Sequence, residues 1–216
     1  MPFRYTDGDF NIGGLEGTRL VVAAFGTLCG LTGIIAGIFE VLQGNISTGG
    51  IVISTIGPDY LMHEDFTYYA VTIIPNFLVT GILATISSIL VILWSVRYVQ
   101  RENGALILFF LSVMQVLVGG GWVIDLGLMA SVLATRIDNP VDWLRKNLNH
   151  RAKYWLIWLF PFSITAYSLV SGSMLILSVA GMNNQALIRL LEPLAAFMFV
   201  PILLMILGGT IYDVEK

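Results

Sequence analysis

Hydrophobic residues form five long runs that are separated by polar segments. The runs cover residues 20–42, 70–96, 105–135, 154–180 and 187–212. A stretch of about 18 or more apolar residues is long enough to cross a bilayer as a helix. The pattern therefore predicts an all-α integral membrane protein, folded as a helical bundle in a single transmembrane domain over residues 1–216.

The third run is too long for one upright membrane helix. As an α-helix, its 31 residues from Ala105 to Thr135 would extend about 46 Å, against a hydrocarbon core of about 30 Å. Gly119, Gly120 and Gly121 lie in its middle, and each costs about 1 kcal/mol in a helix interior relative to alanine. The run is therefore either one tilted helix or a hairpin bent at these glycines. In a hairpin, arms of about 14–17 residues form two thin spans or a re-entrant loop.

Positive charge favours the hairpin. Lys and Arg collect in the cytoplasmic loops of membrane proteins, and the chain has 11 of them. If the third run is one helix, five of these residues lie on the cytoplasmic side and six lie outside. If it is a hairpin, ten lie inside and only Arg189 lies outside. We therefore predict six membrane segments, with the N- and C-termini both in the cytoplasm.

Composition narrows the class of protein further. Charged residues make up 12% of the chain, whereas soluble domains contain about 25%. The net charge is −3 and the basic residues fall mainly in the predicted inner loops, so nucleic acid is not an expected partner. Cys29 is the only cysteine and lies within the first apolar run, which excludes a disulfide framework and a Cys-based metal site.

Two connecting segments have distinct patterns. The outer loop, residues 43–69, contains no Lys or Arg and includes a β-prone run at 51–56 that fits a short strand or a dip into the headgroups. The inner segment, residues 138–153, opens with Asp-Asn-Pro, which is typical of a helix start. Its mixture of apolar and basic residues predicts an amphipathic helix on the inner leaflet, where anionic lipid attracts it.

Glycines in the first run recur at spacings of three or four residues. This spacing places Gly26, Gly30, Gly33 and Gly37 on one helical face, where a second helix backbone can approach closely. We predict that this glycine face packs against another helix of the same chain. Contact with a second copy, in a homo-oligomer, is the alternative.

Polar residues share helical faces in the second and fourth runs. These are Thr72, Asn76 and Thr80 in the second run, and Ser163, Tyr167, Ser171 and Ser178 in the fourth. Polar side chains in membrane helices usually bond to neighbouring helices. A path for a small solute or ion along these faces is the alternative.

A further group of polar residues is predicted to meet at the outer end of the bundle. The group consists of Glu40, Asn45, Asn76, Asp125, Arg189 and Glu192. Carboxylates at membrane depth are costly and are candidates for function, since they bind hard cations or protons. Glu40 and Asp125 are the pair expected to approach each other, because Arg189 and Glu192 have the spacing of an intrahelical ion pair. The alternative is that these are ordinary interface charges.

Motifs of enzymatic chemistry do not occur in the sequence. The chain has no GxxxxGK[ST], GxGxxG, HExxH or GxSxG pattern. Its two histidines, His63 and His150, fall on opposite sides of the membrane in the predicted topology, which argues against a two-histidine metal or haem site. We therefore expect no catalytic residue, no cofactor and no bound metal.

Three stretches of the chain carry a family resemblance. They are GIFEVLQGN at 37–45, TIIPNFLVTGILA at 72–84, and LVGGG at 117–121 leading to ATRI at 134–137. These stretches resemble segments of a family of small prokaryotic integral membrane proteins of unassigned function. The resemblance implies an integral membrane protein of five or six segments and gives no residue a role.

These patterns lead to one main functional hypothesis and two alternatives. The main hypothesis is a non-enzymatic, multi-pass protein of a prokaryotic plasma membrane that acts through packing, lipid contact or a membrane partner. The first alternative is a permeation protein that uses the polar faces of the second and fourth runs. The second is an outer-leaflet enzyme or cation site built on Glu40, Asp125 and Glu192.

Overall fold

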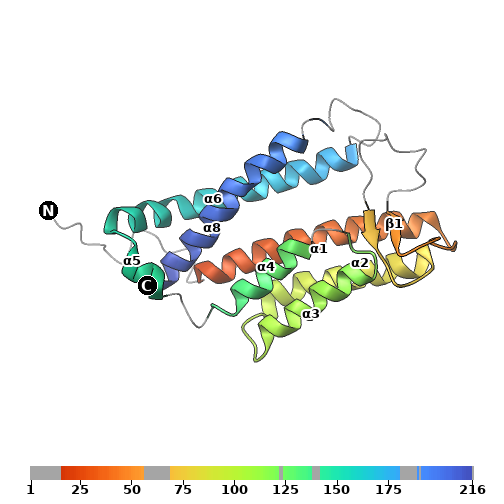
Figure 1. Cartoon of the computed structure of the whole chain (residues 1–216), viewed down its shortest axis with the longest axis horizontal. Coiled ribbons are helices and arrows are strands. Elements are labelled where there is room, and N and C mark those ends of the chain that lie inside the picture. Colours follow the sequence, from red (N-terminus) through yellow and green to blue (C-terminus); the bar gives the residue numbers. More distant parts are fainter. Residues whose placement is uncertain are drawn as a thin grey trace.

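The computed structural model describes residues 16–55, 69–121, 124–137, 142–180, 189 and 191–215 (Figure 1). Its helices are α1 (Gly17–Gln43), α2 (Phe77–Leu93) with the π-helical continuation η2 (Trp94–Tyr98), α3 (Gly104–Leu117), α4 (Ile124–Ala134), α5 (Asp142–Asn147), α6 (His150–Ala180) and α8 (Leu191–Glu215). Two short strands, β1 (Val52–Ser54) and β2 (Tyr69–Val71), lie between α1 and α2 in the sequence.

Within the described ranges, four helical stretches are long and apolar enough to cross a membrane. They are Gly17–Gln43, Phe77–Tyr98, His150–Met174 and Ala196–Glu215. α3 and α4 are also apolar but shorter. The largely helical structure, with four helices of membrane length, is consistent with the predicted all-α class and with a membrane protein.

The third apolar run is broken at its glycines. α3 ends at Leu117 and α4 begins at Ile124. Between them Gly119 and Gly121 have φ angles of 97° and 84°, which residues with a Cβ rarely adopt. α3 and α4 pack against each other and the chain reverses direction between them (Figure 1). The run is therefore a helical hairpin and not one long tilted helix.

The helices form two groups (Figure 1). α1, α2, α3 and α4 pack into one bundle, and α6 and α8 pack against each other beside it. The α6–α8 pair meets α1 near the start of that helix and diverges from it toward the end that carries the strands. The two groups are therefore joined mainly at one end of the molecule.

A carboxylate from α8 closes this junction. Asp213 accepts hydrogen bonds from the backbone N–H groups of Gly17 (2.5 Å) and Thr18 (2.7 Å), the first two residues of α1. A Cβ on Gly17 would lie only 2.6 Å from the carbonyl oxygen of Gly209, so the two helices touch through their backbones. The last turns of α8 thus satisfy N–H groups that the first turn of α1 leaves unpaired.

The inner segment differs from its prediction as a single helix over residues 138–153. Residues 138–141 lie outside the described part of the chain, α5 covers Asp142–Asn147, and α6 already begins at His150. The side chain of Asn149 accepts a hydrogen bond from the N–H of Ala152 at 2.8 Å, which is the geometry of a helix N-cap. This cap starts a new helix, so the basic residues that follow belong to the first turn of α6.

The strands attach the end of α3 to the start of α2. β1 and β2 pair as an antiparallel two-stranded sheet, so the predicted β-prone run forms a strand. Beyond β2, Thr72 forms a bridge with Val118, directly after α3. Ile53 and Ala70 pack on Phe77, the first residue of α2. The sheet thereby fixes one end of the four-helix bundle.

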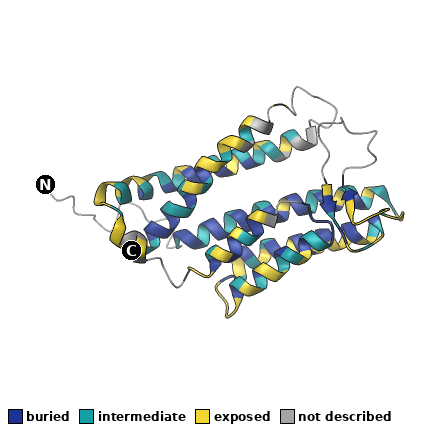
Figure 2. Cartoon of the chain, in the orientation of Figure 1, coloured by how far each residue is buried: buried dark blue, intermediate teal, exposed yellow. Residues whose placement is uncertain are grey.

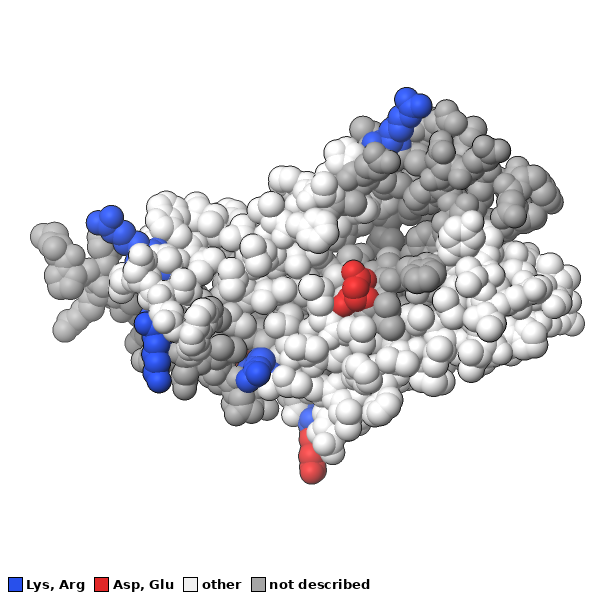
Figure 3. Space-filling view, in the orientation of Figure 1, with Lys and Arg blue, Asp and Glu red and all other residues white. Residues whose placement is uncertain are grey.

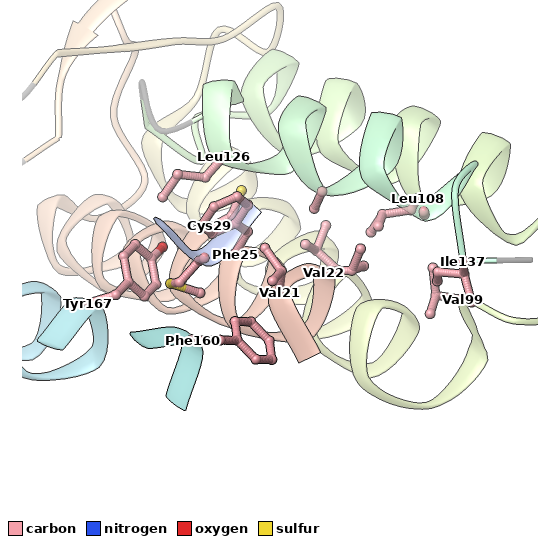
Figure 4. Close-up of a cluster of buried hydrophobic side chains, with 14 residues drawn as sticks. Val21, Val22, Phe25, Cys29, Val99, Leu108, Leu126, Ile137, Phe160 and Tyr167 are labelled. Carbon is pink, nitrogen blue, oxygen red and sulfur yellow. The ribbon is translucent and has the colours of Figure 1, made fainter. Parts of the chain in front are cut away.

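Buried apolar side chains join the two groups of helices (Figure 4). Phe25 of α1 meets Tyr167 of α6 with ring centroids 5.4 Å apart, and Phe160 lies in the same cluster. Exposed residues lie along the outer faces of the helices (Figure 2). Many of them are large and apolar, such as Phe110 and Phe199. An apolar exterior of this extent suits lipid better than water.

The glycine face of α1 lies against helices of the same chain. A Cβ on Gly30 or on Gly37 would lie 2.7 Å from a backbone carbonyl oxygen of α2. A Cβ on Gly26 would collide with a side chain of η2, and one on Gly33 with side chains of α2 and α3. The four glycines therefore allow α1 to approach its neighbours at backbone distance.

We expect Gly30→Leu to destabilise the bundle by about 3 kcal/mol, the upper part of the usual range for an overpacked interior, because its side chain separates α1 from α2. Leu31→Ala is the control, since Leu31 is the next residue and 42% exposed. Thermal unfolding in detergent measures both changes. An equal loss in the two variants would mean that the glycine face makes no stabilising contact.

Candidate functional site: a sealed carboxyl group

The most unusual polar group in the described structure is the side chain of Glu40. It lies in the last turn of α1, near the strands, and its residue is 0% exposed. Neither carboxyl oxygen has a hydrogen-bond partner among the described residues. Burying an isolated, ionised carboxylate in an apolar interior is very unfavourable. The burial of Glu40 without a hydrogen-bond partner therefore requires a specific explanation.

Two glycines from other elements create the space for this side chain. A Cβ on Gly119 would lie 2.5 and 2.6 Å from the two carboxyl oxygens of Glu40. A Cβ on Gly81 of α2 would lie 2.9 Å from the Cβ of Glu40. The carboxyl group is thus covered by the backbone of the segment that links α3 to α4. We call this segment, residues 118–121, the glycine turn.

Hydrogen bonds hold the glycine turn in place over Glu40. The N–H of Gly119 donates to the carbonyl oxygen of Val71 at 3.0 Å, which ties the turn to β2. The hydroxyl of Thr80 in α2 donates to the carbonyl oxygen of Val118 at 2.6 Å. These two bonds attach the turn to β2 and to α2.

Asn45 and Asn76 meet, as their prediction in one outer group requires. The side-chain amide of Asn76 donates to the side-chain oxygen of Asn45 at 2.7 Å; Asn45 is exposed and Asn76 is half-buried. The oxygen of Asn76 also accepts from the N–H of Val79 at 3.2 Å and so caps α2. In these contacts the two amides fasten the end of α1 to the start of α2, and they do not bond to Glu40.

Asp125 lies at a different level of the bundle from Glu40. It is exposed in the first turn of α4. Two residues later, a Cβ on Gly127 would lie 3.1 Å from the sulfur of Cys29. Cys29 precedes Glu40 by 11 residues of α1, or about 16 Å along the helix axis. The shared site of Glu40 and Asp125 therefore has no support in the contacts of either residue.

The remaining members of the predicted group belong to the other pair of helices. Arg189 is exposed just before α8, and Glu192 lies in the first turn of α8, with its side chain outside the described part of the structure. Across the described ranges, no group of three or more His, Cys, Asp or Glu residues could hold a metal ion. Glu40 is therefore a candidate site by itself.

A second buried polar contact was missed by the sequence analysis. The side-chain amide of Gln115 in α3 donates to the backbone carbonyl oxygen of Cys29 at 2.8 Å, and the thiol of Cys29 lies 3.6 Å from the oxygen of that amide. Gln115 is 2% exposed. The available signal was a single amide within an otherwise apolar helix, since such residues usually bond to a neighbouring helix.

Among the described residues, the site offers one acid and no second reactive group beside it. A carboxyl group in this position can hold or release a proton, whereas acid–base hydrolysis needs a second group placed on the substrate. Comparison with known proteins adds no further assignment. No family model, curated protein or solved structure matches this chain. Its function is therefore inferred from its own charges and contacts.

Proposed function

We propose that the chain is a non-enzymatic, multi-pass protein of a prokaryotic plasma membrane that acts by contact with lipid or with a membrane partner. In this proposal α1, α2, α6 and α8 span the membrane, and α3 and α4 form two further, thinner segments. Both termini lie in the cytoplasm. The resemblance of three stretches to prokaryotic membrane proteins supports the choice of membrane.

The distribution of basic residues supports this orientation. Arg19, Arg97, Arg101, Arg136, Lys146, Arg151 and Lys153 lie near the start of α1, the end of η2, the end of α4, α5 and the start of α6. Several contacts place these segments at one end: Gln100 bonds to Glu16, and Lys153 pairs with Glu215. In Figure 3 most of the visible Lys and Arg side chains lie toward that end. Cytoplasmic ends of membrane proteins have this excess.

The contact proposal rests on one observation: polar side chains on the predicted faces of the second and fourth runs form hydrogen bonds to groups of the protein itself. Thr72 and Thr80 share a hydrogen bond of 2.6 Å, and Thr80 also bonds to the backbone after α3. In α6, the hydroxyl groups of Ser163 and Ser171 donate to backbone carbonyl oxygens of their own helix, the latter to that of Tyr167. Hydroxyl groups bonded to the backbone in this way are occupied and are not free to bind a passing solute. On the same face the hydroxyl of Tyr167 is buried, without a hydrogen-bond partner among the described residues.

Contact with lipid is expected at both the apolar faces and the basic end. The exposed faces of α6 and α8 carry Trp155, Phe162 and Phe199, among others. In α5, Trp143 is 66% exposed and Lys146 is also exposed. Such a combination suits the headgroup region of an anionic leaflet. A partner protein or a second copy could cover the same apolar faces.

Cysteine labelling tests the topology. In a Cys29→Ser background, we expect Ser47→Cys to react with a membrane-impermeant maleimide on intact cells, because it follows α1 at the outer end. Asn147→Cys in α5 should react only after the membrane is permeabilised. Reaction of Asn147→Cys on intact cells would place α5 outside and leave five membrane segments in place of six.

A flux measurement tests the contact proposal itself. Purified protein in liposomes is expected to release trapped alkali ions and small neutral solutes no faster than empty liposomes of the same lipid. The polar-face double variant Ser163→Ala/Ser171→Ala serves as the matched control. Flux above that of empty liposomes, reduced in the double variant, would overturn the proposal in favour of permeation.

A further inference from the structure

The surroundings of Glu40 point to a property beyond the proposed contact with lipid or a partner. They restrict what this carboxyl group can bind. α2 and the glycine turn lie against it, and β1, β2, α3 and α4 contact α1, α2 or the turn. Along the described residues of these elements, the only titratable side chains are Tyr69 and Asp125, and both are exposed. The acidic residues and the histidine of residues 56–68 lie outside the described chain. Within the described structure, therefore, no charge balances an ionised Glu40.

The immediate neighbours of the carboxyl group are unsuited to a metal ion. Hard cations in proteins are held by about six or more oxygen ligands. Here the backbone of Gly119 lies against the carboxyl oxygens, and neither oxygen has a hydrogen-bond partner among the described residues. The carbonyl oxygen of Val118, the preceding residue, already accepts a hydrogen bond from the hydroxyl of Thr80. A single proton neutralises the group without any further ligand.

We propose that Glu40 is a proton-binding site and that the glycine turn is its lid. With the proton bound, the carboxylic acid is neutral and the turn packs over it. When the proton leaves for water at the outer end of the bundle, the remaining carboxylate requires solvation, and the turn lifts away from α1. The site thereby couples the proton concentration outside to the position of the α3–α4 hairpin.

The construction of the lid fits this role. It contains three consecutive glycines, which change backbone conformation at low steric cost. Apart from bonds to α3, two hydrogen bonds among the described residues attach the lid to its neighbours. The N–H of Gly119 donates to Val71 of β2, and the hydroxyl of Thr80 in α2 donates to Val118. Breaking a few hydrogen bonds of about 0.5–1.5 kcal/mol each is a smaller loss than keeping an unpaired carboxylate buried.

Hydrogen–deuterium exchange of the lid amides tests the proposal on the full-length protein in detergent. Glu40→Gln is the neutral variant, and comparison at the same pH cancels the intrinsic pH dependence of exchange. We expect the amides of Gly119 and Gly120 to exchange at the same rate in both proteins at acid pH, and at least about tenfold faster in the wild type at alkaline pH, a difference of about 1.4 kcal/mol. Asp125→Asn should behave as the wild type.

Two results would overturn the proposal. One is equal exchange in wild type and Glu40→Gln over the whole pH range. The other is suppression of the difference by Na⁺ or K⁺ at fixed alkaline pH, which would assign the site to an alkali ion. If Glu40→Gln does not fold, Glu40→Met replaces it as the neutral variant.

Infrared spectroscopy provides a readout of the proton itself. The wild type should have a carboxylic-acid C=O band that the Glu40 variant lacks, and the band should vanish over the pH range in which lid exchange accelerates. Absence of this band from the wild type while the lid is closed would also overturn the proposal.

Discussion

Gly119→Ala is expected to cost about 2–5 kcal/mol of stability, the sum of left-handed backbone strain and overpacking. Gly119 has a φ angle of 97°, and its added Cβ would lie within 2.6 Å of both carboxyl oxygens of Glu40. The side chain of Glu40 is wholly buried, so the added Cβ meets a side chain that is enclosed by protein. Thermal or denaturant unfolding in detergent measures the loss.

Gly44→Ala separates the two causes of this loss. Gly44 also has a positive φ angle, 86°, but a Cβ there would meet nothing within 4 Å. Its φ of 86° and ψ of −166° lie in a region that almost only glycine adopts, so its replacement should cost only backbone strain, about 1–3 kcal/mol. In a Glu40→Ala background, the cost of Gly119→Ala should fall to the same value, because the colliding oxygens are gone. An undiminished cost in that background would show that Glu40 does not lie under the glycine turn.

Asp213→Ala is expected to destabilise the protein by about 3 kcal/mol, since it removes two hydrogen bonds to a charged group, each worth about 1.5–3 kcal/mol. It leaves the first N–H groups of α1, at Gly17 and Thr18, without their acceptor. Their amide exchange should accelerate together with the loss in thermal stability. The α6–α8 pair would lose its main polar attachment to the bundle.

Two variants at the same end serve as controls. Asp213→Asn keeps one acceptor oxygen and is expected to lose about half as much stability as Asp213→Ala. Glu215→Gln removes the surface ion pair with Lys153. The side chain of Glu215 is 39% exposed and that of Lys153 is 16% exposed. Such surface pairs contribute about 0–1 kcal/mol. A loss at Glu215 as large as that at Asp213 would contradict the assignment of Asp213 as the helix cap.

The sequence could predict which residues belong to the candidate site, but not which of them lie next to each other. The sequence identified Glu40, Asn45 and Asn76 because polar groups at the ends of apolar runs are uncommon and expensive. It paired Glu40 with Asp125 because both were expected at one membrane depth. The two residues come from different helices, however, and depth along one helix does not determine which neighbours a side chain meets.

The sequence by itself determined the local features of this protein. Run length and composition specify apolar helices, since hydrocarbon excludes unpaired backbone groups, and consecutive glycines specify where the third run breaks. Only the tertiary structure decided which groups meet. It joined Asp213 to the start of α1 across 196 residues, Gln115 to Cys29 across 86 residues, and the glycine turn to Glu40. Such contacts depend on how separate helices pack. A periodic pattern, like that of the glycine face in α1, indicates that a face is packed but not which residues it meets.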